Sequence, residues 1–202
     1  MITQSVNLGF LASGNGSSAR AIVSAIGAGS LPAQARLMVS NRKDAPALAF
    51  AAQVGIPALC IPTKSDPEAA DARLLAAMQT HGVDLIVLSG YLRQLGTRTL
   101  AAYRNRVLNI HPGPLPRFGG HGMYGRRVHE AVIAAGVPQS GITIHLVDEE
   151  YDRGPILDQR SVPLEAGDTA ESLEKRVTSL EPAFFVQTLQ RIARGEIELP
   201  HV

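Results

Sequence analysis

The stretch that decides the fold is VNLGFLASGNGSSARAIV, residues 6–23. Its first part, Val6 to Ala12, is an apolar run that predicts a buried strand. From Ser17 onward the pattern is that of a helix start, with serines able to cap it. Gly14 and Gly16 lie between the two, and a tight glycine turn from strand to helix is common in α/β proteins. The stretch therefore predicts the first strand-turn-helix unit of such a domain.

The rest of the chain continues this alternation of apolar runs and Ala-rich helical patterns. Further strands are expected at Arg36 to Ser40, Ala58 to Ile61, Asp84 to Ser89 and Val107 to Ile110, with helices beginning near Ser17, Pro46, Pro67 and Thr97. The second half predicts a helix from Gly125 to Ala135, two paired strands at Gly141 to Val147 and Ile156 to Val162, and a last helix from Thr169 to Arg194 with a break or kink at Pro182. We expect one α/β domain over residues 1–202: a mostly parallel Rossmann-like sheet, helices on both faces and a short antiparallel extension in the C-terminal half.

Composition narrows the class of partner. Lys and Arg number 19 against 18 Asp and Glu, a net charge of +1, which offers no basic surface of the size that nucleic acid binding needs. Cys60 is the only cysteine, so no disulfide forms within the chain. No apolar stretch approaches membrane-spanning length, and the start lacks the basic region of a signal peptide. We expect a cytoplasmic monomer or homodimer with no membrane partner, and nothing in the sequence requires a metal.

The glycine turn is a candidate anion site. Free amides at a helix N-terminus and the positive end of the helix dipole favour a phosphate, and the glycines of residues 14–18 allow close approach. A tight turn without a ligand is the plain alternative. Residues 14–19 also satisfy the G-x-G-x-x-A fingerprint of dinucleotide sites, and Arg42 could meet the 2′-phosphate of NADP in an oxidoreductase or sensor. A single phosphate explains the turn with fewer assumptions.

A second candidate site lies at the end of the fifth expected strand. Period-two alternation puts Asn109 and His111 on the same side, at the edge where ligands bind in such sheets. Prolines at 112, 114 and 116 hold the following segment rigid. The alternative is that both side chains only hydrogen-bond this loop. Together with a phosphate turn at an earlier strand end, the pair favours catalysis.

An acidic loop, DEEYDRGP at residues 148–155, joins the two late strands. Most such clusters are solvated hairpin loops. A carboxylate near His111 would favour the imidazolium form and so make the histidine an acid that donates to a developing oxyanion. Composition does not say which acid of the loop does this.

Four motifs carry a family resemblance: SGNGS at 13–17, LSGYLR at 88–93, NIHP at 109–112 and D-x-x-x-D-x-G-P at 148–155. In this order they resemble the glycinamide ribonucleotide transformylases, a family of folate-dependent formyltransferases. The resemblance implies Asn109, His111 and Asp152 as catalytic residues. It implies that Gly14, Asn15, Gly16, Ser17 and Ser18 bind the substrate phosphate, that Glu181 contacts the same substrate, and that Lys64, Leu92, Arg93, Gln94, Leu95 and Asn109 contact the folate. Lys64 stands where the family commonly has arginine, and the loop 118–125 differs from the commonest form.

The implied reaction transfers the formyl group of 10-formyltetrahydrofolate to the amine of glycinamide ribonucleotide, in purine synthesis. The amine attacks directly, and Asn109 and a protonated His111 donate to the oxyanion of the tetrahedral intermediate. Residues 1–105 would then bind the phosphate, and residues 106–202 would carry catalysis and folate binding. A formyltetrahydrofolate hydrolase or a methionyl-tRNA formyltransferase shares the catalytic residues, but each usually has an extra domain for which this chain has no room.

Overall fold

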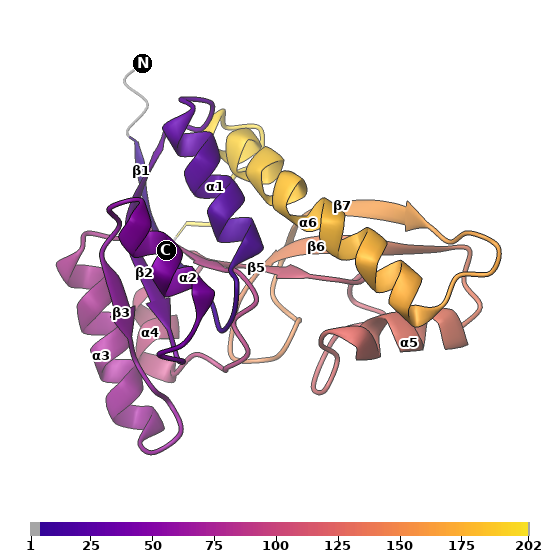
Figure 1. Cartoon of the computed structure of the whole chain (residues 1–202), viewed down its shortest axis with the longest axis horizontal. Helices are drawn as coiled ribbons and strands as arrows, with labels where there is room; N and C mark the ends of the chain where they lie inside the picture. Colours follow the sequence, from indigo (N-terminus) through magenta and orange to yellow (C-terminus); the bar gives the residue numbers. More distant parts are fainter. Residues whose placement is uncertain (1–4, 202) are drawn as a thin grey trace.

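The computed structural model describes residues 5–201; residues 1–4 and 202, which the expected domain includes, lie outside the described residues. One sheet of seven strands forms the centre, in the order β3-β2-β1-β4-β5-β6-β7 (Figure 1). The strands are β1 (Val6–Leu11), β2 (Ala33–Ser40), β3 (Ala58–Cys60), β4 (Leu85–Leu88), β5 (Val107–His111), β6 (Gln139–Leu146) and β7 (Ile156–Pro163). The predicted α/β domain is confirmed.

The sheet has a parallel part and an antiparallel part. Strands β1 to β5 pair in parallel, whereas β6 runs antiparallel to both β5 and β7. The predicted extension is therefore present. Strand β2 begins at Ala33, earlier than the expected Arg36, because its first residues pair with Val6 to Leu8 of β1.

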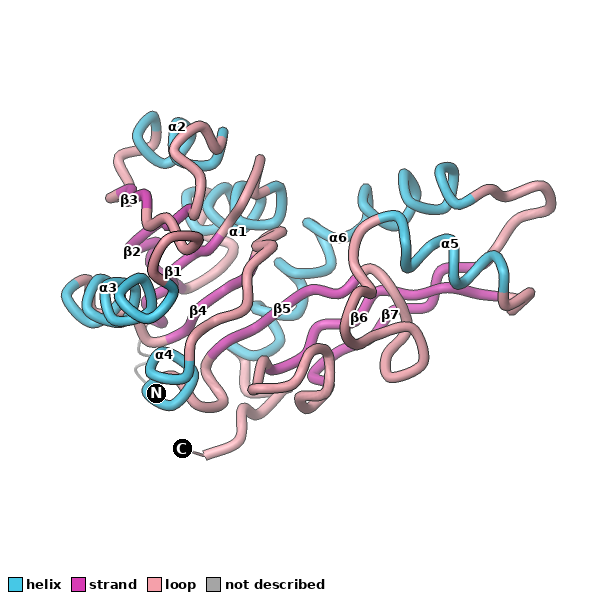
Figure 2. The backbone as a smooth tube through the Cα atoms, turned by 90° about the horizontal axis from the view of Figure 1, so that it is seen from below, coloured by secondary structure: helices cyan, strands magenta, loops and turns pink. Residues whose placement is uncertain are grey.

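Two groups of helices cover the two faces of the sheet (Figure 2). One core cluster includes buried residues of α1 (Ser17–Gly27), α2 (Pro46–Gln53), α5 (Arg126–Ala134) and α6 (Ala170–Ala193). The other includes residues of α3 (Pro67–Thr80) and α4 (Thr97–Ala102). Strands β1 and β4 have alternate residues in each cluster, as expected for a sheet buried on both faces.

The last helix corrects one prediction. Helix α6 runs without a break from Ala170 to Ala193, although Pro182 lies inside it and removes one backbone donor. Buried apolar residues stand on both sides of the proline, Leu173 and Val177 before it and Phe184 and Phe185 after it. The packing of this face on the sheet outweighs the loss of one backbone hydrogen bond at the proline. The predicted break at Pro182 is therefore wrong.

Within residues 5–201, no helix combines the length and the apolar character needed to cross a membrane.

Parallel strands β1, β4 and β5 end at the same edge of the sheet, and at the end of each lies one of the sequence motifs described above. This carboxyl edge is where ligands bind in open α/β sheets. The fold therefore brings the separate motifs to one place.

Candidate active site

Ser13 joins the first two motifs at the carboxyl edge. Its hydroxyl donates to Asn41 Oδ1 at 2.6 Å and accepts the Leu92 N–H at 2.8 Å, and its own N–H donates to the Gly90 carbonyl at 3.1 Å. The glycine turn after β1 is thus tied to the segment that follows β4. Ser89 adds a second link, because its hydroxyl accepts the N–H of Ala19 in the first turn of α1.

The turn leaves the start of α1 open to a ligand. Gly16 is the N-cap residue, with φ 63°, and no side chain caps the helix. A Cβ at Gly16 would meet Ala12 at 3.2 Å and Ala47 at 3.3 Å, so both the conformation and the packing require glycine. Among residues 5–201, the N–H groups of residues 15–18 have no hydrogen-bond acceptor. These amides are available to an anion.

The three predicted catalytic residues meet in one cluster. His111 Nδ1 lies 3.5 Å from Asp152 Oδ2, and the other carboxylate oxygen lies 3.5 Å from Nε2 of His145. Asn109 Nδ2 lies 3.1 Å from the same His145 nitrogen. Both histidines are buried, and the carboxylate side chain is 11% exposed. One carboxylate therefore stands between two imidazoles, beside one amide.

Burial acts on the pKa of His111. Desolvation lowers that pKa below its ordinary value, although Asp152 and the Phe118 carbonyl act in the opposite direction. In the site without substrates this favours a neutral ring near pH 7, and the protonated His111 of the expected mechanism stays a prediction. Burial alone would raise the pKa of Asp152, but His145, His111 and the Gly120 N–H together hold it below its usual value. Asp152 is ionised.

His145 is the residue of this cluster that sequence reasoning missed. It lies opposite Asn109 in the antiparallel pairing of β5 with β6, and Thr143 lies opposite His111. The signal was available in part, because Thr143 and His145 alternate along an expected strand in the same way as Asn109 and His111. Only the register of the two strands brings the pairs together.

The predicted folate residues differ in their burial and in their contacts. Leu92 is 67% exposed, whereas Leu95 is buried in the core cluster under α3 and α4. Arg93 donates from Nε to Thr63 at 3.0 Å, and Gln94 donates to the Glu149 carbonyl at 3.2 Å. Gln94 thus joins this segment to the aspartate loop. Lys64 is exposed and makes no hydrogen bond or ion pair within the described chain.

A cavity of about 240 Å³ opens beside Leu95, between α3 and the segment after β4. Its lining is mostly apolar, with four polar side chains, Thr63, Asp71, Tyr91 and Gln94. Asp71 is already used, since it accepts the backbone N–H groups of Arg98 and Thr99 at the start of α4. The cavity extends the space next to the predicted folate residues.

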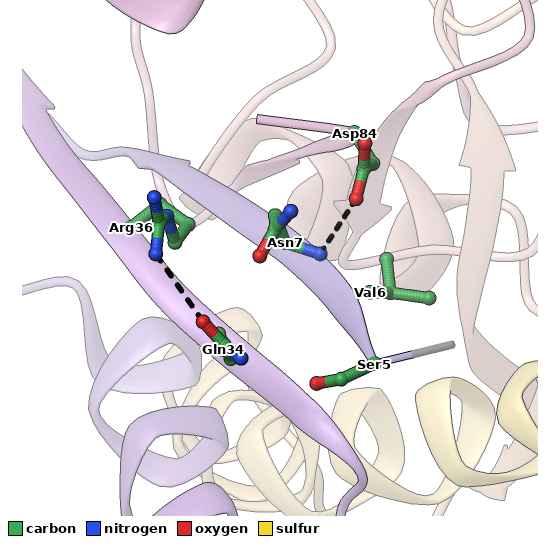
Figure 3. Close-up of a pocket in the computed structure, with 6 residues that line it drawn as sticks. All are labelled: Ser5, Val6, Asn7, Gln34, Arg36 and Asp84. Atoms are coloured by element: carbon green, nitrogen blue, oxygen red, sulfur yellow. Dashed lines mark hydrogen bonds between the residues drawn. The ribbon is translucent and has the colours of Figure 1, made fainter. Parts of the chain in front are cut away.

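A larger hollow, about 700 Å³, lies elsewhere (Figure 3). It is lined by Ser5, Val6, Asn7, Gln34, Arg36 and Asp84, which stand near the amino ends of their strands. Its polar groups bond to one another, with Arg36 donating to Gln34 and the Asn7 N–H donating to Asp84. It lies at the edge of the sheet opposite to the catalytic cluster.

Glu181 lies on α6, the helix that packs against α1. It is partly buried, and no cation within the described part of the chain pairs with its carboxylate. Burial raises the pKa of Glu181 to about 7. A carboxyl group held in this way is more costly to keep charged in the folded protein than in the unfolded chain.

Replacing Glu181 with glutamine should change the pH dependence of stability. Between the usual pKa near 4.5 and the folded value of about 7, the folded protein binds a proton that the unfolded chain releases, so stability falls as pH rises. We expect Glu181→Gln to gain roughly 1–3 kcal/mol over wild type on going from pH 5 to pH 8. Urea unfolding at both pH values measures this, with Glu130→Gln as an exposed control. An equal pH dependence in wild type and variant would contradict the explanation.

Within residues 5–201, no group of three or more His, Cys, Asp or Glu side chains is arranged to hold a metal ion. The chemistry that the cluster itself offers is proton transfer and hydrogen bonding. A neutral imidazole beside an ionised carboxylate is able to take up a proton, and the Asn109 amide offers an N–H donor. An uncapped helix N-terminus for a phosphate lies at the same sheet edge.

The chain is similar to known proteins over most of its length. The family model described as Formyl transferase matches residues 6–189. A phosphoribosylglycinamide formyltransferase of Arabidopsis thaliana is 40% identical over 95% of this chain, which spans 66% of that protein. The protein of the same name from Bacillus subtilis is 35% identical, over 92% of this chain and 95% of its own. The crystal structure of the Brucella melitensis protein is 36% identical and superposes with a TM-score of 0.84, over 98% and 100% of the two chains.

Proposed function

The chain belongs to the formyl transferase family, and from this premise we propose that it transfers a formyl group from 10-formyltetrahydrofolate to the amine of glycinamide ribonucleotide. The products are formylglycinamide ribonucleotide and tetrahydrofolate, in purine biosynthesis. The observation that carries the proposal is the meeting of Asn109, His111 and Asp152 at the sheet edge that also holds an open helix N-terminus. We place this activity in the cytoplasm.

The acceptor's phosphate would bind at residues 14–18. The four free amides there and the start of α1 favour a dianion over a neutral group. Glu181 would contact the same substrate from α6. This arrangement supports a small phosphorylated acceptor over water, and so a transferase over a formyltetrahydrofolate hydrolase.

The catalytic cluster would serve one direct attack. The neutral amine of the acceptor adds to the formyl carbon, and the carbonyl oxygen becomes an oxyanion that the Asn109 amide stabilises as it forms. The attacking nitrogen must lose a proton, and the leaving nitrogen of the carrier must gain one. His111 and Asp152 would take up the first proton and return it to the leaving nitrogen as its bond to carbon breaks. No covalent enzyme intermediate is needed.

The carrier would lie along residues 92–95, next to the 240 Å³ cavity, which Thr63 lines, and Lys64, the next residue in the chain, would be the basic contact. We assign phosphate binding to residues 1–105, and catalysis and folate binding to residues 106–202. Of the proposed folate contacts, however, only Asn109 belongs to the second part, and Lys64 and residues 92–95 belong to the first, so folate binding uses both. Binding both substrates across one edge supplies the proximity that a two-substrate transfer requires.

A nucleotide-binding oxidoreductase or sensor is less well supported. Arg42, the residue that would meet the 2′-phosphate of NADP, forms an exposed ion pair with Asp44 at 2.9 Å. Such a function would also leave the buried Asn109, His111 and Asp152 cluster without a role. The formyltransferase proposal uses both features.

Replacing Gly16 with alanine should weaken binding of the acceptor. Alanine there is strained at φ 63° and comes within 3.2 Å of Ala12, so the amides of the turn must shift. Losing one or two charge-assisted hydrogen bonds to the phosphate should raise the KM for glycinamide ribonucleotide about tenfold to a hundredfold. Steady-state kinetics measures this change.

Gly29→Ala is the matched control for this variant. Gly29 also has a positive φ, 71°, but no atom lies within 4 Å of an added Cβ. The control should bear the conformational strain and leave the KM for the acceptor unchanged. An unaltered KM in a folded Gly16→Ala variant would contradict phosphate binding at this turn.

A further inference from the structure

The backbone of residues 118–120 holds two members of the catalytic cluster at once. The Phe118 carbonyl lies 2.7 Å from His111 Nε2, and the Gly120 N–H donates to Asp152 Oδ2 at 3.0 Å. Only Gly119 separates these two backbone groups. A three-residue segment therefore sets the positions of both the imidazole and the carboxylate.

The Phe118 contact fixes which nitrogen of His111 carries the proton. The carbonyl and the ionised carboxylate of Asp152 both only accept hydrogen bonds, but the carbonyl lies at 2.7 Å, a good hydrogen-bond distance, and the carboxylate lies at 3.5 Å. In the neutral ring the proton is therefore expected on Nε2. His111 Nδ1, which faces Asp152, is then a lone pair and not a donor. This is the reverse of the usual catalytic dyad, in which Nδ1–H donates to the carboxylate and Nε2 acts as the base.

His145 is fixed by the same kind of contact on its other nitrogen. Its Nδ1 lies 2.9 Å from the Leu146 carbonyl and therefore donates to it, and its Nε2 lies 3.1 Å from the Asn109 amide nitrogen. The carboxylate of Asp152 lies 3.5 Å from His145 Nε2 and 3.5 Å from His111 Nδ1, which is longer than a good hydrogen bond.

Gly119 is glycine for reasons of space. Its φ is not in the left-handed region, but a Cβ there would overlap the Leu115 side chain and lie 2.9 Å from Cβ of Asp152. A larger residue therefore requires the Leu115 side chain, Asp152 or the segment itself to shift. A shift of Asp152 or of the segment would change the contacts that the Phe118 carbonyl and the Gly120 N–H make with the cluster.

We propose that the backbone of residues 118–120, with Gly119 as its positioning residue, holds His111 as the Nε2–H tautomer. His111 Nδ1, beside Asp152, is then the atom that takes up one proton. This inference rests on the proposed function for its use. During transfer, the acceptor nitrogen forms its bond to the formyl carbon and releases one proton, which binds at His111 Nδ1 beside Asp152. The same proton leaves for the carrier nitrogen as that nitrogen's bond to the formyl carbon breaks, and the cluster returns to its starting state.

The first test needs no substrate, so its result is independent of the proposed function. Nitrogen NMR of the ¹⁵N-histidine-labelled protein at a pH where His111 is neutral reports which ring nitrogen carries the proton, and the spectrum of His111→Asn assigns the signals. We expect the Nε2–H tautomer. The Nδ1–H tautomer would overturn the proposal.

The second test uses Gly119→Ala, with Gly27→Ala as the control, since an added Cβ at Gly27 meets no atom within 4 Å and its φ is ordinary. We expect Gly119→Ala to lose the tautomer preference and to lower kcat about tenfold or more, while the KM values of both substrates stay within about threefold. The control should match wild type. Unchanged kcat and tautomer in a folded Gly119→Ala would overturn the role of this residue. If the variant does not fold, the wild-type spectrum alone decides the proposal.

Discussion

His111→Ala should nearly abolish formyl transfer while leaving binding of the phosphorylated acceptor close to normal. The substitution removes the nitrogen that stands 3.5 Å from Asp152 and is positioned to take up the proton of the attacking amine. Loss of a positioned acid or base costs about 10²- to 10⁴-fold in rate. We propose that the acceptor's phosphate binds at residues 14–18, which make no hydrogen bond or ion pair with His111 among the described residues. Steady-state turnover and calorimetric binding of glycinamide ribonucleotide measure the two quantities separately.

The control for this variant is His121→Ala. His121 is an exposed histidine of the loop after β5, and its ring contacts Tyr151 edge to face. It makes no contact with Asn109, His111 or Asp152, so its removal should change turnover little. Near-wild-type turnover in a folded His111→Ala would exclude His111 from the chemistry.

The second large effect is expected for Asp152→Asn. Removing the carboxylate charge removes the interaction that raises the pKa of His111, so burial should then lower that pKa further. The ring would take up the amine proton less readily, and we expect turnover to fall by about 10²-fold or more. An NMR titration of His111 and the steady-state rate should both show the change.

Glu150→Gln is the control in the same loop, because Glu150 is an exposed acid whose side chain makes no contact with the cluster. Its substitution should leave both the rate and the pKa of His111 as in wild type. An unchanged His111 pKa in Asp152→Asn would contradict the electrostatic explanation, even if activity fell.

The sequence predicts most of the fold because its signals are local. Apolar runs and capping patterns set nearly all the strands and helices, and period-two alternation puts Asn109 and His111 on one side of β5. The helix that continues through Pro182 could not be predicted in this way. Its continuity depends on the burial of Val177, Phe184 and Phe185 against other elements.

The site is predictable only in part for a similar reason. His145 enters the cluster through the register between β5 and β6, and the lowered pKa of His111 follows from its burial. The Phe118 carbonyl is a backbone group, and no residue pattern shows where it points. The choice of Asp152 among the acids of residues 148–152 came from the family resemblance. In the structure, Asp152 has a φ of 57° and accepts the Gly120 N–H, and its carboxylate lies between the two histidines.

The central claim is that this chain passes a formyl group to a phosphorylated amine. The most direct measurement follows the absorbance of 10-formyl-folate with the purified protein and one of three additions: glycinamide ribonucleotide, formyl-acceptor tRNA, or no acceptor. We predict consumption only with glycinamide ribonucleotide, at a rate that His111→Ala nearly abolishes. Equal consumption without an acceptor would identify a hydrolase, and no consumption with the ribonucleotide would contradict the account.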